Sequence, residues 1–136
     1  MGKNSFILTA LLFVFLFGFA EVAMSQVEGE PYVKISVLKI DEAKIDGAID
    51  LLSELQLSTL ESEDGCIAYD VLLSDDDSTQ AFIYESYESE DAYNKHLKSK
   101  HYIEIYTKKL KPMLKEVTTT KVFLLNFEGV YSDEVI

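Results

Sequence analysis

The chain alternates between two hydrophobic periods, and the order in which they occur limits the folds that it can adopt. Alternating or continuous apolar runs predict β-strands over residues 32–40, 66–73, 81–88 and 117–127. Apolar residues at helical spacing follow the first of these runs, and again the third. The predicted order is therefore β-α-β-β-α-β, which is the order of the ferredoxin-like α+β fold.

One face of the predicted sheet is left without helices. In this fold four antiparallel strands carry both helices on the same side. The strand over residues 66–73 is apolar on both faces, with Tyr69 on one and Leu72 on the other. Large exposed apolar patches mark interfaces, so we expect a homodimer that forms sheet against sheet.

The first 25 residues resemble a cleavable export signal rather than part of the domain. Lys3 precedes an uncharged apolar run over residues 6–19, and Ala23 and Ser25 are small residues at the positions that a signal peptidase requires. We expect cleavage near Ser25, a folded domain over residues 26–136, and a periplasmic or secreted protein. Contact with the membrane is then limited to the signal segment before cleavage. An uncleaved anchor is the alternative.

The composition excludes several classes of function. The net charge is −12 and every basic side chain is a lysine or histidine, so nucleic-acid binding is not expected. The single cysteine, Cys66, cannot form an intramolecular disulfide. Glycine-rich nucleotide-binding motifs and nucleophile elbows are absent from the sequence, so nothing predicts a bound flavin or nicotinamide, and we expect no cofactor.

A glutamate and a histidine are the first candidates for chemistry. In the third predicted strand Glu85 shares a face with apolar residues, and a carboxyl group placed there must be paired, hydrogen-bonded or protonated. His96, on the following helix, is its natural partner. Together with Tyr69, Tyr87 and Tyr102, such a pair would supply a base, an orienting group and hydrogen-bond donors around one cavity. The alternative is that Glu85 and His96 only satisfy each other in the core.

His96 and His101 are the only histidines, and their spacing does not favour a metal site. Five residues turn a continuous helix by about 500°, which leaves the two rings about 140° apart. They would share a metal only if the helix broke between them, and a break is expected near Ser99. Metal-binding helices prefer a spacing of four, and we expect no metal. His101 is either a helix-end residue or part of a pocket.

Three motifs lie between Glu63 and Tyr102: Gly65-x3-Tyr69, Glu85-Ser86-Tyr87 and Ala92-x3-His96-x4-His101-Tyr102. With these motifs the segment resembles the antibiotic biosynthesis monooxygenase (ABM) domain superfamily, and most closely its quinol monooxygenase and autoinducer-2 isomerase branches. The resemblance implies a dimeric α+β barrel built from ferredoxin-like protomers. It also implies that His96 acts as the base and Glu85 as its orienter.

The resemblance also implies an activity. The expected function is an exported, cofactor-independent monooxygenase that oxidises a quinol-like or polyphenolic small molecule with O2. Substrate contacts are assigned by resemblance to Tyr69, Tyr87, His101 and Tyr102. The absence of tryptophan argues against haem degradation, and the absence of arginine weakens a phosphorylated substrate. A non-catalytic small-molecule binder and an isomerase of a small dicarbonyl compound remain the alternatives.

Overall fold

The structure is a computed structural model that describes residues 30–125. The predicted signal segment, its cleavage near Ser25 and the C-terminal tail lie outside the described residues. No helix within residues 30–125 is long and apolar enough to span a membrane.

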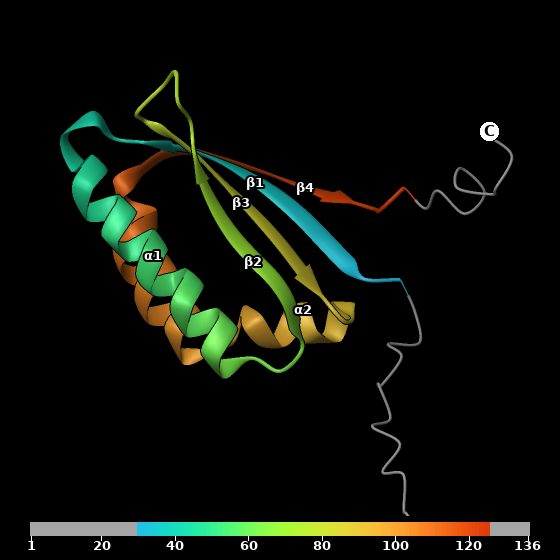
Figure 1. The fold of residues 1–136 in the computed structure, drawn as a ribbon. Coiled ribbons are helices and arrows are strands. Elements are labelled where there is room, and N and C mark those ends of the chain that lie inside the picture. Colours follow the sequence, from blue (N-terminus) through green and yellow to red (C-terminus); the bar gives the residue numbers. More distant parts are fainter. Residues whose placement is uncertain (1–29, 126–136) are drawn as a thin grey trace, which may run out of the picture.

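Four antiparallel strands form one sheet with the order β2-β3-β1-β4 (Figure 1). The strands are β1 (Tyr32–Ile40), β2 (Cys66–Leu73), β3 (Gln80–Tyr87) and β4 (Leu114–Val122). The ferredoxin-like α+β prediction is confirmed, because the two strands from the ends of the domain, β1 and β4, pair beside each other and β3 completes the centre.

The helical layer covers one face of this sheet (Figure 1). A short 3₁₀ turn, η1 (Glu42–Lys44), is capped by the Asp41 side chain and leads into α1 (Ile45–Ser62). The second half holds α2 (Glu90–His96), a π-helical segment η2 (Tyr102–Leu110) and a 3₁₀ turn η3 (Lys111–Met113). The core between the layers contains Leu38, Ile40, Ala48, Leu52, Leu55, Tyr69, Ala81, Ile83, Ile105 and Leu110.

The last strand differs from its predicted range. Sequence patterning predicts residues 117–127, whereas β4 runs from Leu114 to Val122. The 3₁₀ turn η3, which contains Pro112, ends at Met113 and the chain pairs at once, with Leu114 opposite Ile40 of β1. Pairing with the central strand β1 therefore determines where β4 starts. The apolar residues at the end of the predicted range have less influence.

Close contact between the start of β2 and α2 requires a glycine at residue 65. A Cβ placed on Gly65 would lie 2.8 Å from the Ala92 Cβ, a separation that real side chains do not adopt. Gly65→Ala is therefore expected to lower the free energy of unfolding by about 1–3 kcal/mol, the usual cost of overpacking. Urea unfolding measures this loss.

Gly47 in α1 provides the matched control. A Cβ there would meet the Met113 side chain at 3.7 Å, an ordinary contact. Gly47→Ala is expected to raise the free energy of unfolding by about 0.5–1 kcal/mol, because alanine is the better helix former. Equal effects of the two substitutions would contradict the steric explanation.

Candidate active site

His96 lies at the end of a short helix, beneath the sheet. The Ser89 side chain caps α2 by accepting a hydrogen bond from the Ala92 backbone N–H, and the helix ends at His96. The His96 side chain is 1% exposed. Aromatic rings enclose it at centroid distances between 4.9 and 6.4 Å: Tyr69, Tyr87, Tyr93 and Tyr102.

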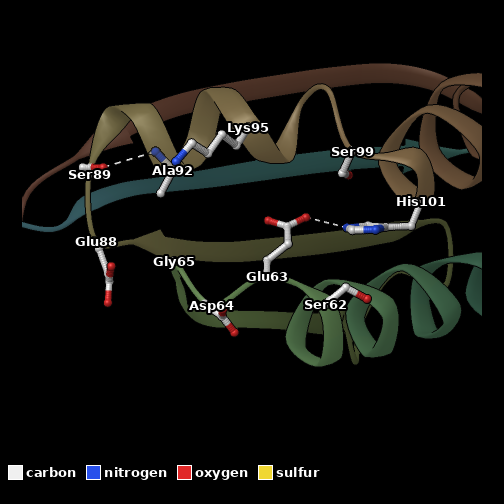
Figure 2. A pocket seen from close by; sticks show the side chains of 10 residues that line it. All are labelled: Ser62, Glu63, Asp64, Gly65, Glu88, Ser89, Ala92, Lys95, Ser99 and His101. Carbon is white, nitrogen blue, oxygen red and sulfur yellow. Dashed lines mark hydrogen bonds and ion pairs between the residues drawn. The ribbon is translucent and has the colours of Figure 1, made fainter.

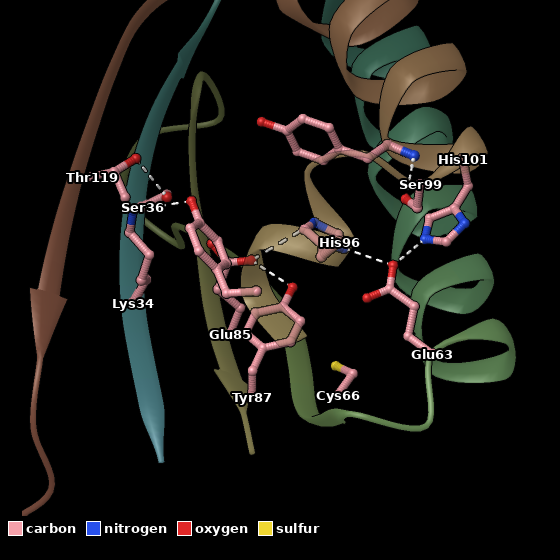
Figure 3. Close-up of polar contacts among 12 residues, drawn as sticks. Lys34, Ser36, Glu63, Cys66, Glu85, Tyr87, His96, Ser99, His101 and Thr119 are labelled. Carbon is pink, nitrogen blue, oxygen red and sulfur yellow. Dashed lines mark hydrogen bonds and ion pairs between the residues drawn. The ribbon is translucent and has the colours of Figure 1, made fainter. Parts of the chain in front are cut away.

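Glu63, which the sequence analysis did not select, binds both histidines (Figure 3). Its Oε1 lies 2.8 Å from His96 Nδ1 and 2.5 Å from His101 Nε2. Burial opposes ionisation of this carboxyl group, but the hydrogen bonds from the two imidazoles outweigh burial and lower the pKa of Glu63. An ionised carboxylate only accepts hydrogen bonds, so His96 donates through Nδ1. In the neutral ring Nε2 then carries the lone pair.

The second ring nitrogen of His96 faces Glu85. His96 Nε2 lies 3.9 Å from Glu85 Oε2, which is too far for a hydrogen bond, and it has no other partner among the described residues. Glu85 Oε2 instead accepts a hydrogen bond of 2.9 Å from the Tyr87 hydroxyl. Burial raises the pKa of Glu85, against the opposing effects of Tyr87 and His96. Two carboxyl groups with oppositely shifted pKa values thus flank one imidazole, a pattern typical of acid/base sites.

Two cavities are lined by the carboxyl groups that flank this imidazole. An inner cavity of about 40 Å³, between the sheet and the helices, has Glu85 and Tyr102 in its wall. An outer cavity of about 530 Å³ is lined by Glu63 and His101 (Figure 2). His96 itself lines neither cavity; its Nδ1 faces Glu63 of the outer cavity and its Nε2 faces Glu85 of the inner cavity.

The structure brings the residues selected from the sequence around His96, but not into one cavity. Tyr87 is fully buried and hydrogen-bonded to Glu85. His101 lies on the outer side, 6.0 Å from His96 between ring centroids, and faces the outer cavity. The selected residues that line the inner cavity are Tyr69, Glu85 and Tyr102.

Two tyrosines of the inner cavity were missed from the sequence. Tyr93 precedes His96 by three residues, which is the spacing of neighbours on one helix face, and its hydroxyl accepts a hydrogen bond of 3.0 Å from Lys34 Nζ. Tyr106 stacks on Tyr102 with ring centroids 4.9 Å apart. Helical spacing from His96 and Tyr102 would have found both.

Within residues 30–125, Glu63, His96 and His101 also form a set of side chains that could hold a metal ion. One ligand atom from each lies within 4.8 Å of the others. The helix is interrupted between the two histidines, because α2 ends at His96 and Leu97 to Ser99 form a turn. The two histidines could share a metal only if the helix broke between them, and this break is present.

Glu85→Gln is expected to raise the melting temperature at pH 7. Because the folded-state pKa of Glu85 lies above its ordinary value, its protonated form stabilises the fold, and this contribution is lost as the pH rises through the folded pKa. Glutamine stays neutral and can still accept the Tyr87 hydrogen bond. In thermal unfolding from pH 4 to pH 8, the advantage of the variant should grow with pH and be smallest at the acid end. A constant difference across the range would contradict the raised pKa.

One family model matches more than half of the chain. Residues 31–108 match the profile of the family described as antibiotic biosynthesis monooxygenase, ABM. No protein with a curated description matches the chain.

Several solved structures share the fold. A Bacteroides thetaiotaomicron protein, provisionally described as an antibiotic biosynthesis monooxygenase, has a TM-score of 0.68 and 20% identity over 71% of this chain and 91% of its own. A Mycobacterium tuberculosis protein has a TM-score of 0.64 and 27% identity, covering 71% and 96%. A Nitrosomonas europaea protein with the same provisional description has a TM-score of 0.65 and 21% identity, covering 70% and 99%.

Proposed function

Because the chain belongs to the antibiotic biosynthesis monooxygenase (ABM) family, we propose that it is an exported monooxygenase that oxidises a quinol-like or polyphenolic small molecule with O2 and without a bound cofactor. The observation that carries this proposal is the unpartnered Nε2 of His96. This atom is buried, accepts a proton in the neutral ring, and belongs to a ring whose other nitrogen is fixed by Glu63.

His96 Nε2 acts as the base in this proposal. It removes a phenolic or enolic proton from the substrate, and the resulting anion reduces O2 directly. One oxygen atom enters the product and the other leaves as water. Glu63, rather than Glu85, orients the imidazole, since Glu63 accepts the Nδ1 hydrogen bond and its lowered pKa keeps it ionised beside the imidazolium that forms.

The substrate ring is assigned to the inner side of His96, where Nε2 faces Glu85 and where Tyr69 and Tyr102 line the inner cavity. The inner cavity of about 40 Å³ has room for about one water molecule, so a phenolic ring must displace side chains to bind. The stacked pair Tyr102 and Tyr106 lies on η2, a π-helical segment, and such segments are frequent at functional sites. Outward movement of this pair is the proposed opening step.

Oxygen uptake by the purified protein tests the proposal. The protein is incubated with a panel of hydroquinones and polyphenols, with His96→Ala in parallel and the substrate alone as the autoxidation control. Uptake above autoxidation that His96→Ala lowers by about 10²-fold or more is the expected result. A product of unchanged mass would instead identify the dicarbonyl isomerase. Binding without turnover, measured by thermal shift, would identify the non-catalytic binder.

We further propose that the helix-free face of the sheet forms the homodimer. Apolar side chains on this face line a groove of about 600 Å³, among them Ile35, Leu72 and Phe82. Ile35 is 38% exposed and Leu72 52% exposed in the single chain, which is an unfavourable state for such a patch. The monomer would leave this surface in water.

Leu72→Lys is expected to weaken self-association at least tenfold, because it places a charge in the apolar interface. Analytical ultracentrifugation measures the mass of wild-type and variant across a dilution series. Leu57→Lys is the control, since Leu57 is 58% exposed on α1, in the helical layer. A wild-type protein that sediments as a monomer at all concentrations would rule out the dimer.

A further inference from the structure

We propose that Glu63, His96 and His101 form a binding site for a divalent first-row transition-metal ion of the zinc class, and that the bound metal holds His96 in the tautomer that cannot act as the base. The first half of this proposal concerns metal binding alone and needs no substrate. The second half rests on the function proposed above.

The donor atoms suit such a metal in type and in number. Two imidazole nitrogens and one carboxylate oxygen favour zinc and its neighbours over calcium and magnesium, which prefer oxygen. The three atoms lie within 4.8 Å of one another, and bonds to the ion would replace the hydrogen bonds of 2.8 and 2.5 Å that Glu63 Oε1 now accepts from the two nitrogens. Three protein ligands leave further coordination positions for water.

Three separate pieces of backbone bring these donors together. Glu63 follows the last residue of α1, and its backbone N–H is held by the Thr59 carbonyl. His96 ends α2, whereas His101 precedes η2, whose start is fixed by the hydrogen bond of 3.2 Å from the Tyr102 N–H to Ser99 Oγ. The intervening turn removes the rotation of about 140° that a continuous helix would place between the two rings.

Metal binding would also give the unpartnered Nε2 of His96 a partner. With Nδ1 bonded to Glu63, this buried nitrogen has no partner in the described part of the chain. A metal on Nδ1 moves the proton of the neutral ring to Nε2, which then donates towards Glu85 Oε2. That contact is now 3.9 Å and must shorten by about 1 Å to become a hydrogen bond. Glu85, His96 and the ion would then form the carboxylate–histidine–metal arrangement typical of metal sites.

The outer cavity gives an ion and its water ligands access to the site. Glu63 and His101 have side chains 14% exposed, and both line this cavity (Figure 2). Asp64 and Glu88 add carboxylates to its wall, although Lys95 adds one opposing charge. The net charge of −12 further favours the approach of cations.

Metal binding and base catalysis then exclude each other at His96. The base needs a free lone pair on Nε2 and a proton on Nδ1. The metal-bound ring has the reverse arrangement, with the proton on Nε2 directed at Glu85. The ion is therefore expected to inhibit the oxygenase rather than to take part in its reaction.

Isothermal titration calorimetry of the purified protein with Zn²⁺ tests the site directly. We expect one ion per chain, binding at least 100-fold weaker in His101→Ala and in Glu63→Gln, and binding within twofold of wild-type in Glu61→Gln. Glu61 is an exposed acid two residues away and serves as the matched control. Absence of Zn²⁺ binding, or binding that His101→Ala leaves unchanged, would overturn the site.

Two further measurements keep the result independent of folding defects and of substrate. Zn²⁺ should raise the melting temperature of wild-type protein and not that of His101→Ala, since a ligand stabilises only the state that binds it. Ring ¹⁵N spectra of His96 should show its proton on Nδ1 without metal and on Nε2 with Zn²⁺. A proton that stays on Nδ1 with Zn²⁺ bound would overturn the second half alone.

The oxygen-uptake assay separates failure of this proposal from failure of the proposed function. One equivalent of Zn²⁺ should abolish uptake, and a chelator should restore it. Uptake that Zn²⁺ leaves unchanged, with the ion bound, contradicts inhibition but leaves the oxygenase standing. Uptake that requires the ion contradicts a cofactor-free oxygenase and leaves the metal site standing.

Discussion

Glu63→Gln is expected to lower kcat by about 10²- to 10⁴-fold on the substrate that oxygen uptake identifies, which is the range that acid/base catalysis contributes. The amide is close in size to the carboxylate but carries no charge to stabilise the imidazolium that forms when His96 takes a proton. Its NH₂ group can also donate to Nδ1, which favours the wrong tautomer. Steady-state oxygen uptake measures both kcat and KM.

A purely structural role for Glu63 would give a different result. If Glu63 only held helix ends together, Glu63→Gln would change KM and the melting temperature along with kcat. We expect kcat to fall while KM stays within about threefold, because Glu63 contacts the base and not the inner cavity. Glu61→Gln, an exposed neighbour, should retain wild-type kcat. Full activity in Glu63→Gln would exclude Glu63 as the orienting group.

Leu52→Ala is expected to lower the free energy of unfolding by about 2–5 kcal/mol, which is a large share of the roughly 5–15 kcal/mol that stabilises a domain of this size. Leu52 is fully buried at the centre of α1, within the core cluster beneath the sheet. Removal of its side chain leaves a cavity that the surrounding strands cannot fill completely. Urea denaturation measures the change.

The same helix supplies the control for this change. Leu57 is 58% exposed, so Leu57→Ala removes little buried surface and improves helix propensity. We expect a change within about 0.5 kcal/mol. Similar losses from the two substitutions would mean that α1 does not pack on the sheet through the face that carries Leu52.

The sequence was sufficient for the fold because each element carries its own local signal. The strand over residues 32–40 alternates from Val33 to Val37, and Asp41 and Ser89 are capping residues that the structure uses. The acid-rich turn before Gln80 separates the two hairpin strands. The end of β4 was predicted less well, because its apolar residues 123–125 extend past the last residue that pairs with β1.

Glu63 was missed because it lies in a run of acidic residues, and such a run is typical of a solvent-exposed turn. A signal was nevertheless present. The buried face of α1 passes through Ala48, Leu52, Leu55 and Thr59, and residue 63 lies four residues after Thr59, which is one of the two helical spacings of that face. An acid that continues a buried helix face is a candidate for a buried pair. Its two partners lie 33 and 38 residues away, so no local pattern could have identified them.

From the sequence alone, the distance between the two histidine rings could be predicted only for each of two cases. A continuous helix would hold them apart and an interrupted one would not. Whether both rings meet the same carboxylate depends on how α1 packs beside the turn over residues 97–99, which is a tertiary property. The 3.9 Å separation of His96 and Glu85 likewise follows from the competing Tyr87 hydrogen bond.

The three side chains joined by the Glu63 hydrogen bonds all lie at helix ends: Glu63 just after α1, His96 at the end of α2 and His101 just before η2. Helix ends open at a lower free energy than the strands of a core. Fraying of any one end would separate the three side chains while the sheet remained intact. Heat should therefore inactivate this protein below the temperature at which it unfolds. Conversely, a ligand shared by both histidines would fasten three helix ends at once and make the whole helical layer more rigid.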